Sequence, residues 1–529
     1  MFDALFTTTT EYQKLSHALS GKGACALFGL PASGRAQVYA ALCRQLDKPL
    51  CIVTPGEAEA TRFAADLNTL GIPAAVFPAR DYVLRPIEGT AREYEYRRLA
   101  VLGELVGGRL RAVAVPAEAL TQFTTPKEDF CANTRTLHAG DTLLRDDLLA
   151  ALFGAGYTRR AQVDGPGQFS VRGDIVDIFA PDQKMPVRME FWGDEIDNLH
   201  TFDLTTQRRE DAIDKFYLSP AREVLFGKPA DAAEQLQAFL AKQRGKKKTA
   251  MADCMAADLD LLDGGAVPVN MDKYLAVRYP HPATVLDYFD DPILVAEEPA
   301  SIREADRATV YRRGEELKSL ILDGVLCAGL DNLYADPSYL WSKTGHYRTI
   351  CAENFARSMP DQPLKDIINA PAHTLPAWNG EVAGLLEDLK PLCDAGYTVT
   401  LLAGTDRAAA GLARDLRDKG ILVTTDAAAA PAAGLVQVLA GHLSAGCEFP
   451  FAKYALLTGR AFGETSSQKK KRKKAKDALN SLTEITPGDL VVHQNHGIGR
   501  YAGIQRMAVQ GVTKDYLRIE YDKKDVLYV

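Results

Sequence analysis

The stretch GACALFGLPASGRAQVYAALCRQL (23–46) decides the fold of the first part of the chain. Its first eight residues form an apolar run typical of a buried strand, PASG makes a turn, and RAQVYAALCRQL has the apolar spacing of a helix. Strand-like runs recur at 49–55, 74–79 and 111–116, with helical patterns at 57–71 and 91–108 between them. Strands that alternate with helices predict a parallel, doubly wound α/β sheet.

The pattern changes farther along the chain. From about 155 to 205, strand-like runs separated by GPG and APDQ predict a small antiparallel β insert. A further buried strand is expected in ILVAEE (293–298), and a second small α/β domain at about 395–462. The last segment, 487–529, alternates β-branched and aromatic residues with glycine turns, which predicts a small β module. The expected fold is therefore an α/β multidomain protein.

Length and composition exclude several classes of protein. The chain has 529 residues, of which 47% are hydrophobic and 25% charged, as in ordinary globular proteins. Without an apolar run near 18 residues, we expect no membrane span and no membrane partner. The N-terminus lacks the pattern of a secretory signal, and the nine cysteines form no CxxC pair. These features predict a reduced, cytoplasmic protein without a structural zinc site.

Charge is concentrated in one place. The formal net charge is −7, but KKKRKKAK (469–476) contributes seven positive charges, so the remainder of the chain carries −14. We interpret this run first as a solvated linker, with salt-sensitive, sequence-independent nucleic-acid contact as the alternative.

The segment GLPASGRA (29–36) follows a predicted strand and precedes a predicted helix, which is the context of a phosphate-binding P-loop. Arg35 replaces the lysine that reaches the phosphates, and Ala36 replaces the hydroxyl that ligates Mg²⁺. An acidic pair ends the strand ILVA, where such a pair would hold the metal. The sequence favours a vestigial nucleotide site, with a plain strand-to-helix turn as the alternative. Its residues are Gly29, Ser33, Gly34, Arg35, Ala36, Glu297 and Glu298.

The β insert is rich in arginine. Arg188 and Glu190 are expected on one face of a strand and Met189 and Phe191 on the other. Aromatic residues beside arginines are typical of a protein-binding surface, although an ordinary hairpin with solvated arginines has the same composition. The insert carries Arg159, Arg160, Arg172, Arg188, Arg208, Arg209, Phe191 and Trp192.

No catalytic signature is present in the sequence. It contains no GxSxG or HExxH motif, so no catalytic residue is predicted. His493 and His496 have no third ligand in view, which favours turn hydrogen bonds over metal binding. We expect neither a metal nor a cofactor in this chain.

Several long strings together resemble the N-terminal half of the bacterial transcription-repair coupling factor (Mfd) family. They are GLPASGRA, DYVLRPIEGTAREYEYRRL, GQFSVRGDIVDIFAP, PVRMEFWGDEIDNLHTFDLTTQRR and YPHPATVLDYFDDPILVAEEPASI, and the first ~345 residues are similar to a module shared with UvrB. The string PGDLVVHQNHGIGRYAGI resembles the CarD-like RNA-polymerase-interaction domain.

The resemblance implies two protein partners. The first is UvrA, with contacts at Arg172, Arg188, Trp192 and, more weakly, Arg208. The second is the RNA polymerase β subunit, which an edge strand at about 503–510 of a small bent barrel would meet through Ile504, Arg506 and Met507. It also implies that the degenerate P-loop does not hydrolyse ATP. ATP, Mg²⁺ and double-stranded DNA would belong to a translocase motor absent from this sequence.

The resemblance implies six domains or linkers along the chain. Three alternative functions stay open. The ranges are domain 1a (1–133), a UvrA-binding insert (134–219), domain 1b (220–345), a third domain (360–462), a basic linker (463–483) and a truncated CarD-like domain (484–529). A recruiting adaptor is favoured over an active UvrB-like helicase and over a standalone polymerase-binding regulator. Because YDKKDVLYV ends in a strand-forming run, we expect a fragment; a natural terminus docked as an edge strand is the alternative.

Overall fold

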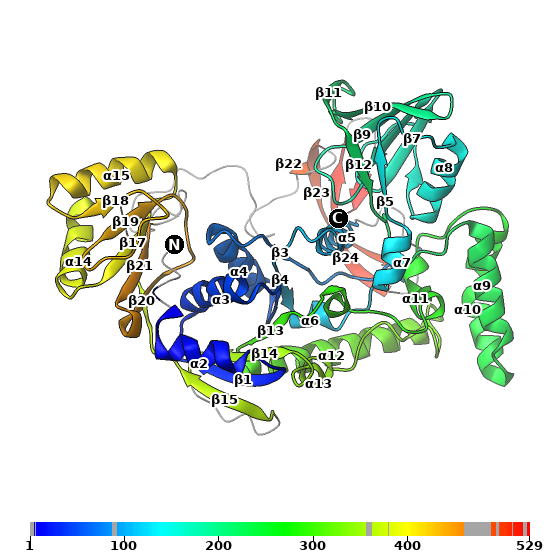
Figure 1. Ribbon diagram of the computed structural model, residues 1–529. Helices are drawn as coiled ribbons and strands as arrows, with labels where there is room; N and C mark the ends of the chain where they lie inside the picture. The colour runs from blue at the N-terminus through cyan, green and yellow to red at the C-terminus, as the bar shows by residue number, and fades with distance from the viewer. Residues whose placement is uncertain are drawn as a thin grey trace. The chain divides into compact units, whose positions relative to one another are not determined.

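The computed structural model describes residues 5, 7–86, 92–355, 362–378, 380–459, 488–493, 497–509, 512–521 and 526–528. The chain divides into two compact units, Met1–Phe462 and Gly463–Val529. The lysine run 469–476, His496 and the end of the predicted edge strand, Gln510, lie outside the described residues. The chain is a multidomain α/β protein with one large parallel sheet and several small ones (Figure 1).

The large sheet confirms the parallel α/β prediction. It has seven strands in the order β15-β1-β14-β13-β2-β4-β3, and every neighbouring pair is parallel. Five of these strands are predicted by the sequence pattern, whereas β14 and β15 are not. The strands are β1 (Gly23–Phe28), β2 (Leu50–Thr54), β3 (Ala74–Val76), β4 (Ala112–Pro116), β13 (Ile293–Glu297), β14 (Arg348–Glu353) and β15 (Leu364–Asn369).

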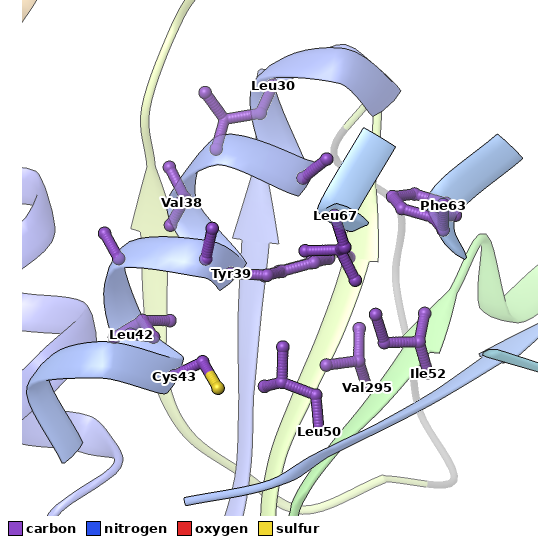
Figure 2. Packing of buried hydrophobic residues seen from close by; sticks show 14 of the residues in the cluster. Leu30, Val38, Tyr39, Leu42, Cys43, Leu50, Ile52, Phe63, Leu67 and Val295 are labelled. Atoms are coloured by element: carbon purple, nitrogen blue, oxygen red, sulfur yellow. The ribbon is translucent and has the colours of Figure 1, made fainter. Parts of the chain in front are cut away.

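Helices cover both faces of this sheet, because its strands carry apolar residues on both sides. On one face, Tyr39 and Phe63 pack over Ile52 and Val295 in the core that Figure 2 shows. On the other face, Leu99 packs in a second core with residues of the remaining helices. The first face is covered by α2 (Thr10–Ala18), α3 (Ala32–Leu46) and α4 (Glu57–Thr69), and the second by α5 (Glu93–Val106), α6 (Ala117–Leu120), α7 (Lys127–Ala132), α12 (Pro299–Leu322) and α13 (Tyr339–Lys343).

The β insert is a separate sheet with its own core. Its six strands lie in the order β11-β10-β9-β8-β7-β6 and are antiparallel except for the short pair β6–β7. A two-stranded ribbon, β5–β12, and helix α8 complete it. The elements are β5 (Arg135–His138), α8 (Arg145–Gly154), β6 (Thr158–Arg159), β7 (Gln168–Arg172), β8 (Ile175–Phe179), β9 (Val187–Trp192), β10 (Glu195–Phe202), β11 (Arg209–Ala212) and β12 (Lys215–Leu218).

A buried charge network joins the large sheet to the chain on either side of the insert. Arg98 of α5 is fully buried, lies over the ring of Phe77 at 4.2 Å and donates from Nε to Oε1 of Glu223 at 2.6 Å. Arg80 contacts the same carboxylate at 3.2 Å and Asp272 at 2.7 Å. Although burial opposes ionisation of Asp272, Arg80 holds its pKa below the usual value. Each buried charge in this network therefore has a partner of opposite sign.

A helical hairpin packs on a third core. Helices α9 (Pro229–Ala241) and α10 (Gly245–Asp263) lie side by side (Figure 1) and contribute Leu236, Met251 and Met255 to a cluster that includes Leu320 of α12. The short helix α11 (Leu275–Arg278) packs in the same cluster.

The region of the predicted second small α/β domain forms a sheet of its own. Its six-stranded sheet has the order β16-β20-β21-β17-β19-β18. The last four strands are parallel to one another, and β20 is antiparallel to both of its neighbours, β16 and β21. Residues of β20 and β21 join the core on the α3 face of the large sheet. The elements are β16 (His373–Leu375), α14 (Val382–Asp394), β17 (Thr398–Leu402), α15 (Asp406–Asp418), β18 (Val423–Thr424), β19 (Val436–Leu439), β20 (Gly446–Phe449) and β21 (Tyr454–Thr458).

The second unit contains an antiparallel sheet of four described strands. These are β22 (Leu490–His493), β23 (Gly497–Val509), β24 (Val512–Glu520) and β25 (Val526–Tyr528), in that order. The long strand β23 pairs with β22 only over 497–500, and the register shifts near Gly503, whose φ is +106°. Within the described part of the unit, the other edge of β23 therefore has no strand partner from Gly503 to Val509.

In the part of the chain that the structure describes, no helix has the length and apolar content needed to cross a bilayer. No cluster of three or more histidine, cysteine, aspartate or glutamate side chains is arranged to hold a metal ion there. All nine cysteines are free thiols.

Candidate functional site

The register of the insert places three of the predicted UvrA contacts on one face of its sheet. Asp177 pairs with Arg188 across β8 and β9, and Arg172 pairs with Ile175 across β7 and β8. Because side chains alternate along a strand, Arg172, Asp177, Arg188 and Trp192 share a face. The opposite face holds the apolar core, which includes Phe191. Phe191 is therefore a core residue.

Asp177 fixes both arginines of this face. Its carboxylate is fully buried and accepts from Arg172 Nη2 at 2.5 Å, from Arg188 Nε at 2.7 Å and from Arg188 Nη2 at 3.0 Å. Arg188 is itself 9% exposed and lies over the ring of Phe202 at 4.8 Å. The hydrogen bonds to Asp177 raise the pKa of Arg188. Arg188 thus serves the packing of the insert, whereas Arg172 is half exposed.

Trp192 is the most exposed large hydrophobic side chain that the structure describes, at 82%. It ends β9, just before Gly193, whose φ of +63° allows the tight hairpin into β10. Arg208 is exposed and follows Gln207, which has a left-handed φ of +58°. Arg209 forms an ion pair with Glu190 on the same face. It is not one of the four predicted UvrA contacts, although the sequence shows it beside Arg208, which is one of them. We call Arg172, Asp177, Arg188, Glu190, Trp192 and Arg209 the arginine face.

The predicted nucleotide residues also come together. The chain leaves β1 through Gly29, with a φ of +87°, and α3 begins at Ala32. Arg35 turns toward the end of β13 and contacts Glu297 at 3.0 Å and Glu298 at 2.8 Å. Tyr39 donates to Glu297 at 2.6 Å. Burial raises the pKa of Glu297, and Arg35 opposes that rise. Arg35 therefore pairs with both carboxylates of this acidic pair.

The second small α/β domain fills the space over this loop. A Cβ on Gly34 would lie 2.9 Å from Sγ of Cys447 and 3.4 Å from the ring of Phe449, both in β20. A Cβ on Gly29 would meet Ala370 at 3.1 Å. The contact extends along α4, where Ser444 donates to Asp66 and Thr69 donates to the carbonyl of His442. The absence of a side chain at Gly34 thus allows β20 to pack closely on the loop. Ser33 is buried beside Gly34.

Alanine at Gly34 should destabilise the protein by about 1–2 kcal/mol, because overpacking against Cys447 outweighs the gain in helix propensity. The matched control is Gly411→Ala in α15, where the added Cβ meets open space and should stabilise by about 0.5–1 kcal/mol. Urea unfolding measures both, and Cys447→Ala should partly rescue the Gly34 variant. Equal stabilisation by the two alanines would show that β20 does not press on the loop.

For the predicted polymerase contacts, the structure describes the backbone. Ile504, Arg506 and Met507 lie in β23 and pair with Leu517, Asp515 and Lys514 of β24. They therefore lie on the stretch whose opposite edge has no described strand partner.

Comparisons with known proteins agree with this arrangement. Residues 136–224 match the UvrB interaction domain, and residues 485–529 match the CarD-like/TRCF RID domain. Over 518 residues the chain is 28% identical to the transcription-repair-coupling factor of Bacillus subtilis (strain 168), covering 95% of this chain and 44% of that protein. The protein of the same name from Staphylococcus haemolyticus (strain JCSC1435) is 26% identical over 95% of this chain and 44% of its own length. That of Staphylococcus aureus (strain MRSA252) is 24% identical, covering 99% of this chain and 46% of its own length.

The chain thus spans less than half the length of the curated relatives it matches. The two matched domains coincide with the β insert that carries the arginine face and with the antiparallel sheet of the second unit. The chain is thus similar along nearly its whole length to transcription-repair-coupling factors, and two of its parts match the UvrB interaction domain and the CarD-like/TRCF RID domain.

Proposed function

We propose that this chain is the recruiting part of a transcription-coupled DNA repair factor. Its insert binds UvrA, and its C-terminal module binds the β subunit of an RNA polymerase stalled at a lesion. The observation that carries the proposal is the exposed Trp192 on the same face of the sheet as Arg172, in the region that matches the UvrB interaction domain. A large exposed aromatic and an arginine on one face supply the side chains that dominate protein–protein binding energy.

The proposal assigns different roles to the four predicted UvrA residues. Trp192, Arg172 and Arg208 are exposed and make direct contact. Arg188 contributes indirectly, because its guanidinium binds the buried Asp177, and Asp177 in turn orients Arg172.

In the second unit, the polymerase would add a strand to the open edge of β23. Backbone N–H and C=O groups from Gly503 to Val509 then supply the hydrogen bonds, while Ile504, Arg506 and Met507 supply selectivity. The β strands of this unit form part of a small barrel in this proposal.

The loop between β1 and α3 is, in this proposal, a degenerate P-loop that binds no nucleotide. Its support is the ion pair of Arg35 with Glu297 and the filling of the loop by Cys447 and Phe449. These contacts disfavour the alternative of an active UvrB-like helicase. ATP, Mg²⁺ and double-stranded DNA would be bound by a translocase motor in the full-length protein, which releases the polymerase.

The test is the affinity of purified UvrA for the chain, measured by biolayer interferometry. Replacing Trp192 and Arg172 by alanine should weaken binding at least 100-fold, because two contacts of hot-spot size are lost. The matched control, Tyr311→Ala with Arg307→Ala, removes another exposed aromatic and arginine, from α12, and should leave the affinity unchanged. Unaltered binding by the Trp192 and Arg172 variant, with its circular dichroism intact, would refute the UvrA assignment.

A further inference from the structure

The turn between α9 and α10 carries a second basic cluster, within the described part of the chain. The sequence KQRGKKK (242–248) places five positive charges in seven residues, and no acidic residue occurs from 235 to 252. All five side chains are exposed, and none has a carboxylate within 4.0 Å among the described residues. We call Lys242, Arg244, Lys246, Lys247 and Lys248 the basic tip.

The charges of α10 are inverted relative to its helix dipole. A helix N-terminus favours acidic residues and its C-terminus favours basic ones. Helix α10 has three lysines in its first turn and no acidic residue there, while Asp260 and Asp263 lie in its last turn. Its N-cap, Arg244, makes no side-chain capping bond. The lysines thus repel one another and the exposed N–H groups of the first turn.

A repulsion of this kind is relieved by an anion, and local conflicts with a fold's own rules are typical of functional positions. A phosphate beside the basic tip would interact favourably with the lysines and with the helix N-terminus together. The cluster therefore has the charge distribution of a polyanion contact.

The surroundings of the tip decide which polyanion fits. Residues 241–250 contain no aromatic and no large aliphatic side chain, and Phe239 and Leu240 pack, partly buried, against the third core. Single-stranded nucleic acids are bound by stacking on aromatic residues, and membrane-surface helices insert apolar ones. Lysines act as point charges, and without side chains that recognise bases they suit the phosphates of a duplex.

We propose that the basic tip of the α9–α10 hairpin binds the phosphate backbone of double-stranded nucleic acid, without sequence preference. This contact is separate from the arginine face and from the lysine run 469–476. It depends on neither the UvrA nor the polymerase assignment, and it would hold the duplex independently of any motor.

The experiment measures binding of the full chain to a fluorescein-labelled 25-bp DNA duplex by anisotropy, from 50 to 200 mM salt. Every protein in the series has the basic residues of the run 469–476 replaced by glutamine, which removes that contribution. The tip variant changes Lys242, Arg244, Lys246 and Lys248 to glutamine and keeps Lys247, which lies against Gly329. The control variant makes the same change in net charge at four scattered, exposed lysines: Lys14, Lys318, Lys390 and Lys419.

The tip variant should bind at least tenfold more weakly at 50 mM salt, and the slope of log affinity against log salt should become shallower by about 3. The control variant should match the parent in both. Because the lost charges oppose the dipole of α10, the tip variant should unfold at a temperature no lower than the parent. Equal losses in the two variants, no duplex binding by the parent, or tighter binding to single strands or to anionic phospholipid vesicles than to the duplex would overturn the proposal. UvrA binding, measured in parallel, reports separately on the function proposed above.

Discussion

Replacing Arg98 by methionine should lower the free energy of unfolding by about 3–5 kcal/mol. The guanidinium of Arg98 is fully buried and makes two contacts with the carboxylate of Glu223, at 2.6 and 3.2 Å. It also donates to Gln122 at 2.9 Å. Methionine fills most of the volume and keeps contact with Phe77, but it leaves Glu223 with only Arg80, at 3.2 Å. The loss of stability therefore measures the free-energy cost of leaving the buried Glu223 carboxylate without its main partner.

The neighbouring Arg97→Met is the matched control for this variant. Arg97 lies on the same helix, is 42% exposed and meets Glu57 at 3.7 Å, so its removal should change stability by less than about 1 kcal/mol. Urea unfolding of both variants gives the comparison. Adding Glu223→Gln to Arg98→Met should recover part of the loss, because the unpaired charge is removed. Equal effects of the two methionine variants would mean that the network contributes little.

Replacing Asp177 by alanine should destabilise the β insert by about 3–5 kcal/mol and weaken the proposed binding of UvrA as a consequence. The carboxylate is fully buried and accepts three hydrogen bonds from Arg172 and Arg188. Alanine leaves Arg188, which is 9% exposed, buried without its carboxylate. Arg172 also loses the contact that orients it.

The insert has its own apolar core, so this damage should remain local. Hydrogen exchange should become faster in β7, β8 and β9, while the large parallel sheet keeps its protection. Asp174→Ala serves as the control, because Asp174 lies in the adjoining turn with a side chain 80% exposed. Unchanged exchange in the insert of the Asp177 variant would contradict the structural role given to this residue.

The strands of the large sheet that are apolar along most of their length could be predicted from sequence, because burial on both faces leaves a nearly continuous signal. β1, β2, β4 and β13 are of this kind. β15 reads LKDIIN and is mostly exposed, so nothing local marks it as a strand. It joins the sheet only because β1 is available to pair with it.

The candidate sites, like the strands, could be predicted only where the sequence carries a local signal. That Arg188 and Glu190 share a face follows from the two-residue period of a strand, which the register confirms. The position of Asp177 under two arginines could not be predicted, because it depends on the alignment of three strands. The approach of Cys447 and Phe449 to Gly34 joins residues more than ~400 positions apart, for which the sequence has no local signal.

The position of β1 inside the large sheet has a consequence for synthesis on the ribosome. The two strands that flank β1 are β14 and β15, and both begin ~320 residues or more after β1 ends. At translation rates of about 5–20 residues per second, β1 therefore waits about 15–65 s with both edges bare. Meanwhile the insert, whose strands are close neighbours in sequence, is complete and free to fold. Nascent chains should thus be most exposed to chaperones, and most prone to aggregate, before residue ~350 emerges.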